Sequence, residues 1–323
     1  MRKKSKNTEH ENAGNADSER KSQGIPPEIK KLMQEVDANV KKLIDIFRFV
    51  LKYKMIFRGQ GVEFAGIRKY MPTDDAKMID WKVSARMSTS GKVDKLYVKI
   101  YEEERDLDVL VLLDTSASML FGTQDKLKSE YAAILAGTIV YAAIETGDNA
   151  GLAMFNEKVH KFIPPSRESV QYYRVLENLV DKKKYGGSKN LKEAIDFAVK
   201  IGRSRTMLFI VSDFISCGDG WEDSLKSASA KFDGVLGIML RDVRDSFLPE
   251  GAGHFRLSDP FSGHISEANL DKVKEKFERM AAFQEKDVET QFHRSKAGFI
   301  KYYTNDPFIK SLMKWFEMWG AGR

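Results

Sequence analysis

The chain lacks several features that would place it in a well-marked class. A single cysteine, Cys217, excludes an internal disulfide and any zinc site built from several cysteines, which favours a reducing compartment. The polar opening residues have no apolar core like that of a secretory signal. The longest candidate span, Tyr131 to Ile144, is shorter than the ~20 apolar residues that cross a bilayer. We therefore expect a cytoplasmic protein without a membrane span.

Motifs for nucleic acids and nucleotides are also missing. Lys and Arg number 53 against 47 Asp and Glu, and the resulting charge of +6 is spread along the chain without a basic stripe that carries interleaved aromatics. The glycines between Arg58 and Arg86 do not form a phosphate loop, because Gly61 is followed by Val62 and Glu63 rather than by Lys and Ser or Thr. We therefore expect no nucleic-acid partner and no nucleotide loop.

The most informative stretch runs from Leu107 to Met119, LDVLVLLDTSASM. Its apolar run is typical of a strand buried on both faces of a parallel sheet, and ligands bind beyond the carboxyl ends of such strands. Asp114, Ser116 and Ser118 could converge there, and three hard oxygens suit Mg²⁺ or Mn²⁺. Alternatively, these residues only end the strand and cap the next helix.

Composition and periodicity divide the chain into four parts. Residues 1–25 are expected to be a disordered polar tail, and 26–54 an amphipathic helix that packs on this domain or on a partner. Residues 55–105 carry glycines among aromatic and β-branched residues, which predicts a small β-rich lead-in with bulged strands. Residues 106–320 form the main domain, with an insertion at 241–297.

Strand and helix patterns alternate through the main domain, which predicts an α/β fold with a doubly wound, mostly parallel sheet. We expect an antiparallel edge hairpin stopped by Pro164 and Pro165. The predicted strands are 107–113, 149–155, 159–163, 206–211, 234–240 and 298–304, and the predicted helices are 126–145, 167–180, 191–202, 267–293 and 307–319.

Asp74, Asp75 and Asp80 in the lead-in could be read as a catalytic carboxylate pair. The sequence Thr-Asp-Asp after Pro72 is more typical of a turn and a helix start.

Two further loops offer oxygens to the same edge of the sheet: Ser188 in GGSKN, and Asp213 at the end of TMLFIV. Together with Asp114, Ser116 and Ser118, they resemble the metal-ion-dependent adhesion site (MIDAS) of von Willebrand factor A-type domains, Asp-x-Ser-x-Ser followed by Thr and then Asp. Ser188 stands where that family usually has Thr. The resemblance implies a Mg²⁺ site, with Mn²⁺ or Ca²⁺ as alternatives, which binds an acidic side chain of another protein. Without a cation, Asp114 and Asp213 should repel each other, so Asp213→Asn should be tolerated.

The upstream segment EFAGIRKYMPTDDAKMIDWKVSAR is similar to the lead-in of the MoxR-associated family called domain of unknown function number fifty-eight. That resemblance covers roughly residues 55–320 and implies a MoxR-type AAA+ ATPase as partner. It favours a metal-dependent adaptor in complex assembly or maturation, with Phe64 to Trp81 as a second contact surface. Many relatives have transmembrane helices before the lead-in, and we do not transfer that feature to this chain.

A metal-dependent phosphoester hydrolase is the alternative function. It would need a base or nucleophile beside the metal, and we expect none of His160, His254 and His264 at a strand end that faces it.

Overall fold

The computed structural model describes residues 27–28, 30–36, 38, 62–72, 74–87, 96–103, 107–251, 253–259 and 261–306. The predicted polar tail at 1–25 and the predicted closing helix at 307–319 lie outside these residues.

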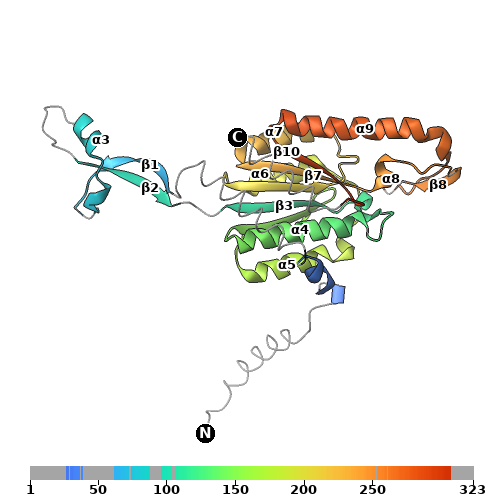
Figure 1. Cartoon of the computed structure of the whole chain (residues 1–323), viewed down its shortest axis with the longest axis horizontal. Coiled ribbons are helices and arrows are strands. Elements are labelled where there is room, and N and C mark those ends of the chain that lie inside the picture. The colour runs from blue at the N-terminus through green and yellow to red at the C-terminus, as the bar shows by residue number, and fades with distance from the viewer. Residues whose placement is uncertain are drawn as a thin grey trace, which may run out of the picture.

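A six-stranded sheet forms the centre of the main domain, in the order β10-β7-β6-β3-β4-β5 (Figure 1). All neighbouring strands are parallel except β4 and β5, which pair antiparallel at one edge. The predicted α/β class and the predicted edge hairpin are therefore confirmed. The strands are β3 (Asp108–Asp114), β4 (Asn149–Phe155), β5 (Val159–Ser166), β6 (Thr206–Ser212), β7 (Gly234–Arg241) and β10 (Gly298–Tyr303).

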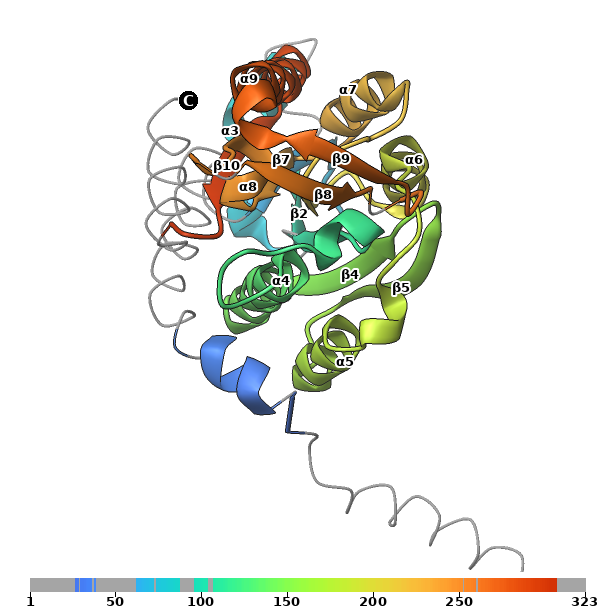
Figure 2. The same cartoon turned by 90° about the vertical axis from the view of Figure 1, so that its right-hand side faces the viewer.

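Helices cover both faces of this sheet (Figure 2). The alternating side chains of β3 show the two cores: Val109, Val111 and Leu113 join the core under α4 and α5, whereas Leu110 and Leu112 join the core under α6, α7 and α9. A strand with apolar residues on both faces must be covered twice, which explains its uninterrupted apolar run. The covering helices are α4 (Lys128–Glu145), α5 (Ser169–Leu179), α6 (Leu191–Ile201), α7 (Trp221–Lys231) and α9 (Leu270–Arg294).

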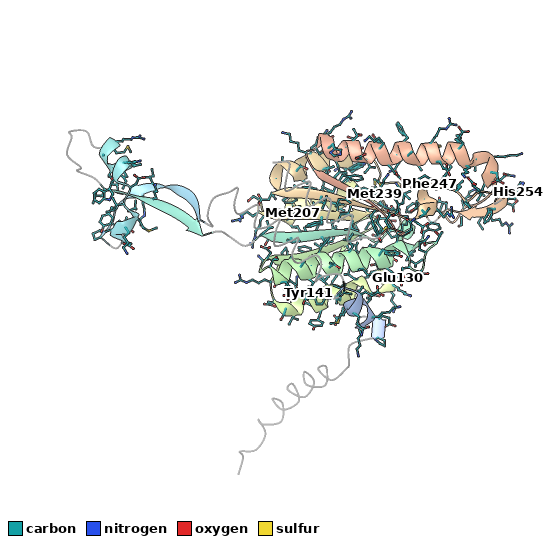
Figure 3. The ribbon with its side chains drawn as sticks, viewed as in Figure 1. Glu130, Tyr141, Met207, Met239, Phe247 and His254 are labelled. Carbon is teal, nitrogen blue, oxygen red and sulfur yellow. The ribbon has the colours of Figure 1, made fainter. Side chains whose placement is uncertain are left out.

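The parallel strands all end at one edge of the sheet, called the carboxyl edge below. The 3-10 turns η2 (Ala117–Leu120) and η3 (Lys182–Lys184), the short helix α8 (Val243–Ser246) and the hairpin of β8 (His254–Ser258) and β9 (Ile265–Asn269) are the remaining elements of the domain. Figure 3 shows Phe247 and His254 at this edge and Met207, near the start of β6, toward the opposite end.

The structure differs from the predicted elements in four places. Strand β5 continues through Pro164 and Pro165 to Ser166, because an edge strand tolerates residues that cannot donate to a ladder. Helix α7 and the β8–β9 hairpin were not predicted. Within the expected insertion at 241–297, α9 is the crossover helix that leads back to β10 beside β7, and it packs on the sheet.

The amphipathic segment predicted at 26–54 contributes to the main core where the structure describes it. Residues 30–36 are helical, and Leu32 and Val36 are buried in the core of α4 and α5. A Cβ atom added to Gly137 of α4 would lie 3.2 Å from Val36 Cγ2, so the two helices approach closely. This segment therefore packs on its own chain.

The lead-in is a separate β-rich unit. Strands β1 (Val62–Lys69) and β2 (Tyr97–Glu103) pair antiparallel with an irregularity between Phe64 and Gly66, as the glycine pattern predicts. Between them, Asp75 caps the turn η1 (Ala76–Met78) and Asp80 caps the helix α3 (Trp81–Arg86). The turn and helix start predicted after Pro72 are therefore confirmed, and Asp74 pairs with Arg68.

Candidate functional site at the carboxyl edge

Asp114 is the last residue of β3 and is completely buried. Its Oδ1 accepts a hydrogen bond from the backbone N–H of Ser116 at 2.8 Å, and its Oδ2 accepts one from the Ser212 hydroxyl at 2.6 Å. The carboxylate is therefore fixed between the ends of the two central strands, β3 and β6.

Ser116 and Ser118 lie in the turn directly after β3. Both are buried, and their hydroxyl oxygens are 3.2 Å apart, within hydrogen-bond distance. Ser116 precedes η2 at the N-cap position, but its hydroxyl makes no capping hydrogen bond. Capping therefore does not account for this side chain, and both hydroxyls remain candidate ligands.

Asp213 follows β6 and is also completely buried. Its Oδ1 accepts a hydrogen bond from the backbone N–H of Ile215 at 2.9 Å. The next residues include two with left-handed backbone, Phe214 with φ 53° and Ser216 with φ 55°, which is uncommon for residues other than glycine. This strained turn holds the Asp213 carboxylate opposite Asp114.

Ser188 does not join the other predicted ligands by any contact in the structure. Its loop lies beside the first one, since the Ala117 N–H donates to Gly187 O at 2.9 Å. The Ser188 side chain is exposed, however, and its hydroxyl donates to Glu157 Oε1 at 2.9 Å.

Two buried lysines complete the site, and sequence reasoning missed both. Lys189 Nζ lies 2.7 Å from Asp114 Oδ2 and also donates to Asp213 Oδ1. Lys128 Nζ lies 2.7 Å from Asp213 Oδ2 and 2.7 Å from Asp245 Oδ2. We call this chain of ion pairs, Asp114, Lys189, Asp213, Lys128 and Asp245, the charge chain.

The sequence contained one signal for Lys128. Lys128 is the first residue of α4, so its positive charge lies at the positive end of the helix dipole. A cation in that position needs a compensating anion nearby. For Lys189, the one signal in the sequence was its position next to the candidate ligand Ser188.

The charge chain fixes protonation in the site. Burial alone would raise the pKa of Asp213, but the ammonium groups of Lys189 and Lys128 hold that pKa far below its usual range. Burial would likewise lower the pKa of Lys189, but Asp114 and Asp213 raise it. Burial raises the pKa of the nearby Cys217 thiol to about 12, so this cysteine stays protonated and is a poor nucleophile near neutral pH.

His160 lies closer to the site than the sequence suggested. Its Nε2 is 2.9 Å from Thr115 Oγ1, and Thr115 stands between Asp114 and Ser116. The Thr115 hydroxyl donates to Phe155 O, so His160 bonds a residue that is tied to the neighbouring strand. The expectation that no histidine lies near this strand end is therefore wrong for His160.

The donor set can be compared with what a divalent cation requires. Both Asp213 oxygens and Asp114 Oδ2 already contact ammonium groups, and Ser188 bonds Glu157 instead. Among the described residues, no group of three or more His, Cys, Asp or Glu side chains is placed to hold a metal ion. Mg²⁺ requires about six oxygen ligands. With Lys189 in this position, the residues present do not fit a divalent cation.

Comparison with known proteins shows the family. The model of the family described as "Protein of unknown function DUF58" matches residues 66–287, which is more than half of the chain. The chain belongs to the DUF58 family. It is 27% identical over 259 residues to an uncharacterized protein of Mycobacterium tuberculosis, and the match covers 79% of each chain. A shorter match, 28% identical over 110 residues, covers 34% of this chain and 24% of the uncharacterized protein YeaD of Bacillus subtilis.

Solved structures with a similar arrangement include von Willebrand A-type domains. The protein BatB of Bacteroides thetaiotaomicron matches at 16% identity and TM-score 0.44, covering 65% of this DUF58 chain and 97% of its own. The VWA domain of SpRpn10 matches at 10% identity and TM-score 0.35, covering 65% of this chain and 94% of its own. In the part of the chain that the structure describes, no helix is long and apolar enough to span a membrane.

Proposed function

We propose that this DUF58 protein is a protein-interaction module that binds its partner at the carboxyl edge of the central sheet. The observation that carries the proposal is the set of large apolar side chains exposed around the charge chain. Leu120 and Phe121 follow the Asp114 turn, and each is 41% exposed; Phe247 follows α8 and is 49% exposed. Large apolar side chains that are exposed at one edge of a domain are typical of a contact surface.

The β8–β9 hairpin extends this surface. It lies at the carboxyl edge in Figures 1 and 2, and it exposes Phe255 and Ile265. Its polar and irregular sequence contributes nothing to either core of the main domain where the structure describes it. A hairpin that does not support the core and exposes apolar groups is better explained by binding than by folding.

The lead-in offers a second contact surface. Figure 1 shows it beyond the amino end of the sheet, opposite the carboxyl edge. It exposes several large apolar side chains despite its small size, namely Ile67, Met71, Met78, Trp81 and Met87. Trp81 is the largest of them, and buried tryptophans commonly dominate the energetics of protein interfaces.

We propose a MoxR-type AAA+ ATPase of the same cell as the partner, with assembly or maturation of a further protein as the outcome, in the cytoplasm. The family resemblance supports this choice. The chain also lacks a glycine-rich phosphate loop, so work driven by ATP would have to come from another protein. A divalent cation would enter this proposal only by displacing Lys189.

Binding of the purified ATPase to the immobilised DUF58 protein tests the proposal. Leu120→Arg and Phe247→Arg should each weaken binding at least about tenfold, because a buried charge would replace an apolar contact. Trp81→Arg tests the lead-in in the same way. Val170→Arg, at an exposed apolar position on α5 away from the carboxyl edge, is the matched control. Undiminished binding by both carboxyl-edge variants would contradict this docking site.

A further inference from the structure

Lys189 places a positive charge between the two carboxylates to which the family resemblance assigns a divalent cation. Its Nζ is 2.7 Å from Asp114 Oδ2 and bonds Asp213 Oδ1, and its side chain is completely buried. An ammonium group is a compact charge with three donors, so it can bridge two carboxylates that would otherwise repel each other.

The backbone around Lys189 is well fixed. The next residue, Asn190, caps α6 by accepting a hydrogen bond from the Glu193 N–H at 3.1 Å, and its own N–H donates to Asn156 O at 2.8 Å. The backbone of Lys189 is therefore held in place at the N-terminus of α6, and its side chain extends between β3 and β6.

Lys128 occupies the other side of Asp213. Its Nζ contacts Asp213 Oδ2 and Asp245 Oδ2, both at 2.7 Å, and lies 5.7 Å from the centre of the Phe121 ring. Both oxygens of Asp213 therefore already contact a cation.

The ammonium groups also disfavour an added metal ion. The charge chain holds three carboxylates and two ammonium groups. A divalent cation bound to Asp114 and Asp213 would lie close to both ammonium groups, and like charges repel each other strongly in a buried site. Removal of the Lys189 ammonium would instead leave Asp114 and Asp213 with room and charge for such a cation.

We propose that Lys189 replaces the divalent cation in this protein, so that the carboxyl edge is a lysine-bridged, metal-free site. Partner binding there is then independent of divalent cations, a consequence that rests on the proposed function. The lysine bridge itself does not depend on the partner.

Mn²⁺ binding followed by electron paramagnetic resonance tests the bridge on the full chain. Wild-type protein should leave the signal of free Mn²⁺ unchanged at millimolar metal, and neither MgCl₂ nor EDTA should shift its melting temperature. Lys189→Met should bind about one Mn²⁺ ion per chain and gain several degrees with Mg²⁺, since it frees two facing carboxylates. Lys192→Met, which removes an exposed lysine paired with Asp196, is the matched control and should behave as wild type.

Three results would overturn the bridge: wild-type Mn²⁺ binding that Asp114→Ala abolishes, a folded Lys189→Met variant without gained Mn²⁺ binding, or Mn²⁺ binding by Lys189→Arg. The arginine variant keeps a positive charge between the two carboxylates, and it provides the test if the methionine variant does not fold. The ATPase assay separates the two proposals. Binding that survives EDTA supports both, whereas absence of binding contradicts the proposed partner and leaves the Mn²⁺ result standing.

Discussion

At the scale of single residues, the charge chain reverses one expectation from the sequence. Without a cation, Asp114 and Asp213 were expected to repel each other, so that Asp213→Asn would be tolerated. In the structure, Asp213 separates two buried ammonium groups, those of Lys128 and Lys189. Its negative charge therefore stabilises the fold, and removal of that charge leaves two cations near each other.

We now expect Asp213→Asn to lower the free energy of unfolding by about 3–5 kcal/mol, the usual cost of breaking a buried ion pair from one side. Urea denaturation measures this value. Asp223→Asn is the control, because Asp223 forms an exposed ion pair with Lys226 on α7, and its loss should leave the stability close to that of wild type. Equal stability of Asp213→Asn and wild type would show that Lys128 and Lys189 do not meet at Asp213.

Glu285 of α9 is a second buried carboxylate, away from the charge chain. It accepts hydrogen bonds from Ser246 and Tyr303 and pairs with Lys301 at 2.8 Å. Burial alone would raise the pKa of Glu285, but Lys301 and Ser246 hold it below its usual value. The folded state therefore binds this proton less readily than the unfolded state does.

The pKa of Glu285 predicts a pH-dependent variant. Because the folded pKa is lowered, Glu285 stabilises the protein above the ordinary pKa of glutamate, and this contribution is lost as the pH falls through the folded value. Glu285→Gln should therefore be less stable than wild type by about 1–3 kcal/mol at pH 7, and the difference should shrink on acidification toward pH ~4. Melting temperatures across this pH range measure it. Glu250→Gln, which removes an exposed partner of Lys274, is the control and should show a much smaller difference from wild type, because solvent screens that pair.

At the scale of elements, sequence patterns predicted the strands and helices whose apolar residues are continuous or periodic. Strands β3 and β6 are buried along their whole length, so their composition alone indicates them. Helix α7 was missed because its sequence is mainly polar and small, and only Trp221, Leu225 and Ala228 supply its apolar contacts. The β8–β9 hairpin was missed because its strands are only five residues long and mainly polar, and the alternation of β8 does not continue in β9.

The same reasoning explains how much of the candidate site could be predicted. Asp114 and Asp213 were located because parallel strands deliver their last residues to one edge. Lys128 and Lys189 were missed because lysine is almost always exposed, and only the folded arrangement brings these two to the same carboxylate. Sequence spacing also cannot show that the Ser188 hydroxyl bonds Glu157 and does not reach the other predicted ligands.

The N-terminal segment is an element whose docking can be tested by truncation. Deletion of residues 1–25 should leave the melting temperature unchanged, since that stretch has little apolar surface to bury. Deletion of residues 1–38 should destabilise the protein by about 3–5 kcal/mol, because Leu32 and Val36 are both buried against the main core. Calorimetry of the two truncated forms distinguishes them, and equal melting temperatures would contradict the docking.

At the scale of the whole molecule, the lead-in and the main domain have separate interiors. Val98 of β2 is buried within the lead-in, where it bridges to Ile79, and the Tyr97 N–H bonds the buried Ser84 hydroxyl. Among the described residues, neither core of the main domain includes a lead-in residue. The lead-in can therefore change its stability or its partner without weakening the sheet that carries the charge chain.

This separation predicts different effects for two similar core truncations. Leu110→Ala removes a buried side chain from β3 and should lower the stability of the main domain by about 2–5 kcal/mol. Val98→Ala removes buried methyl groups from the lead-in and should leave the main thermal transition unchanged. Hydrogen exchange measured by mass spectrometry should show faster exchange only in residues 62–87 and 96–103 of that variant. If Val98→Ala instead lowered the temperature of the main transition as Leu110→Ala does, the lead-in and the sheet would unfold as one unit. Binding of a partner to one of them would then also change the stability of the other.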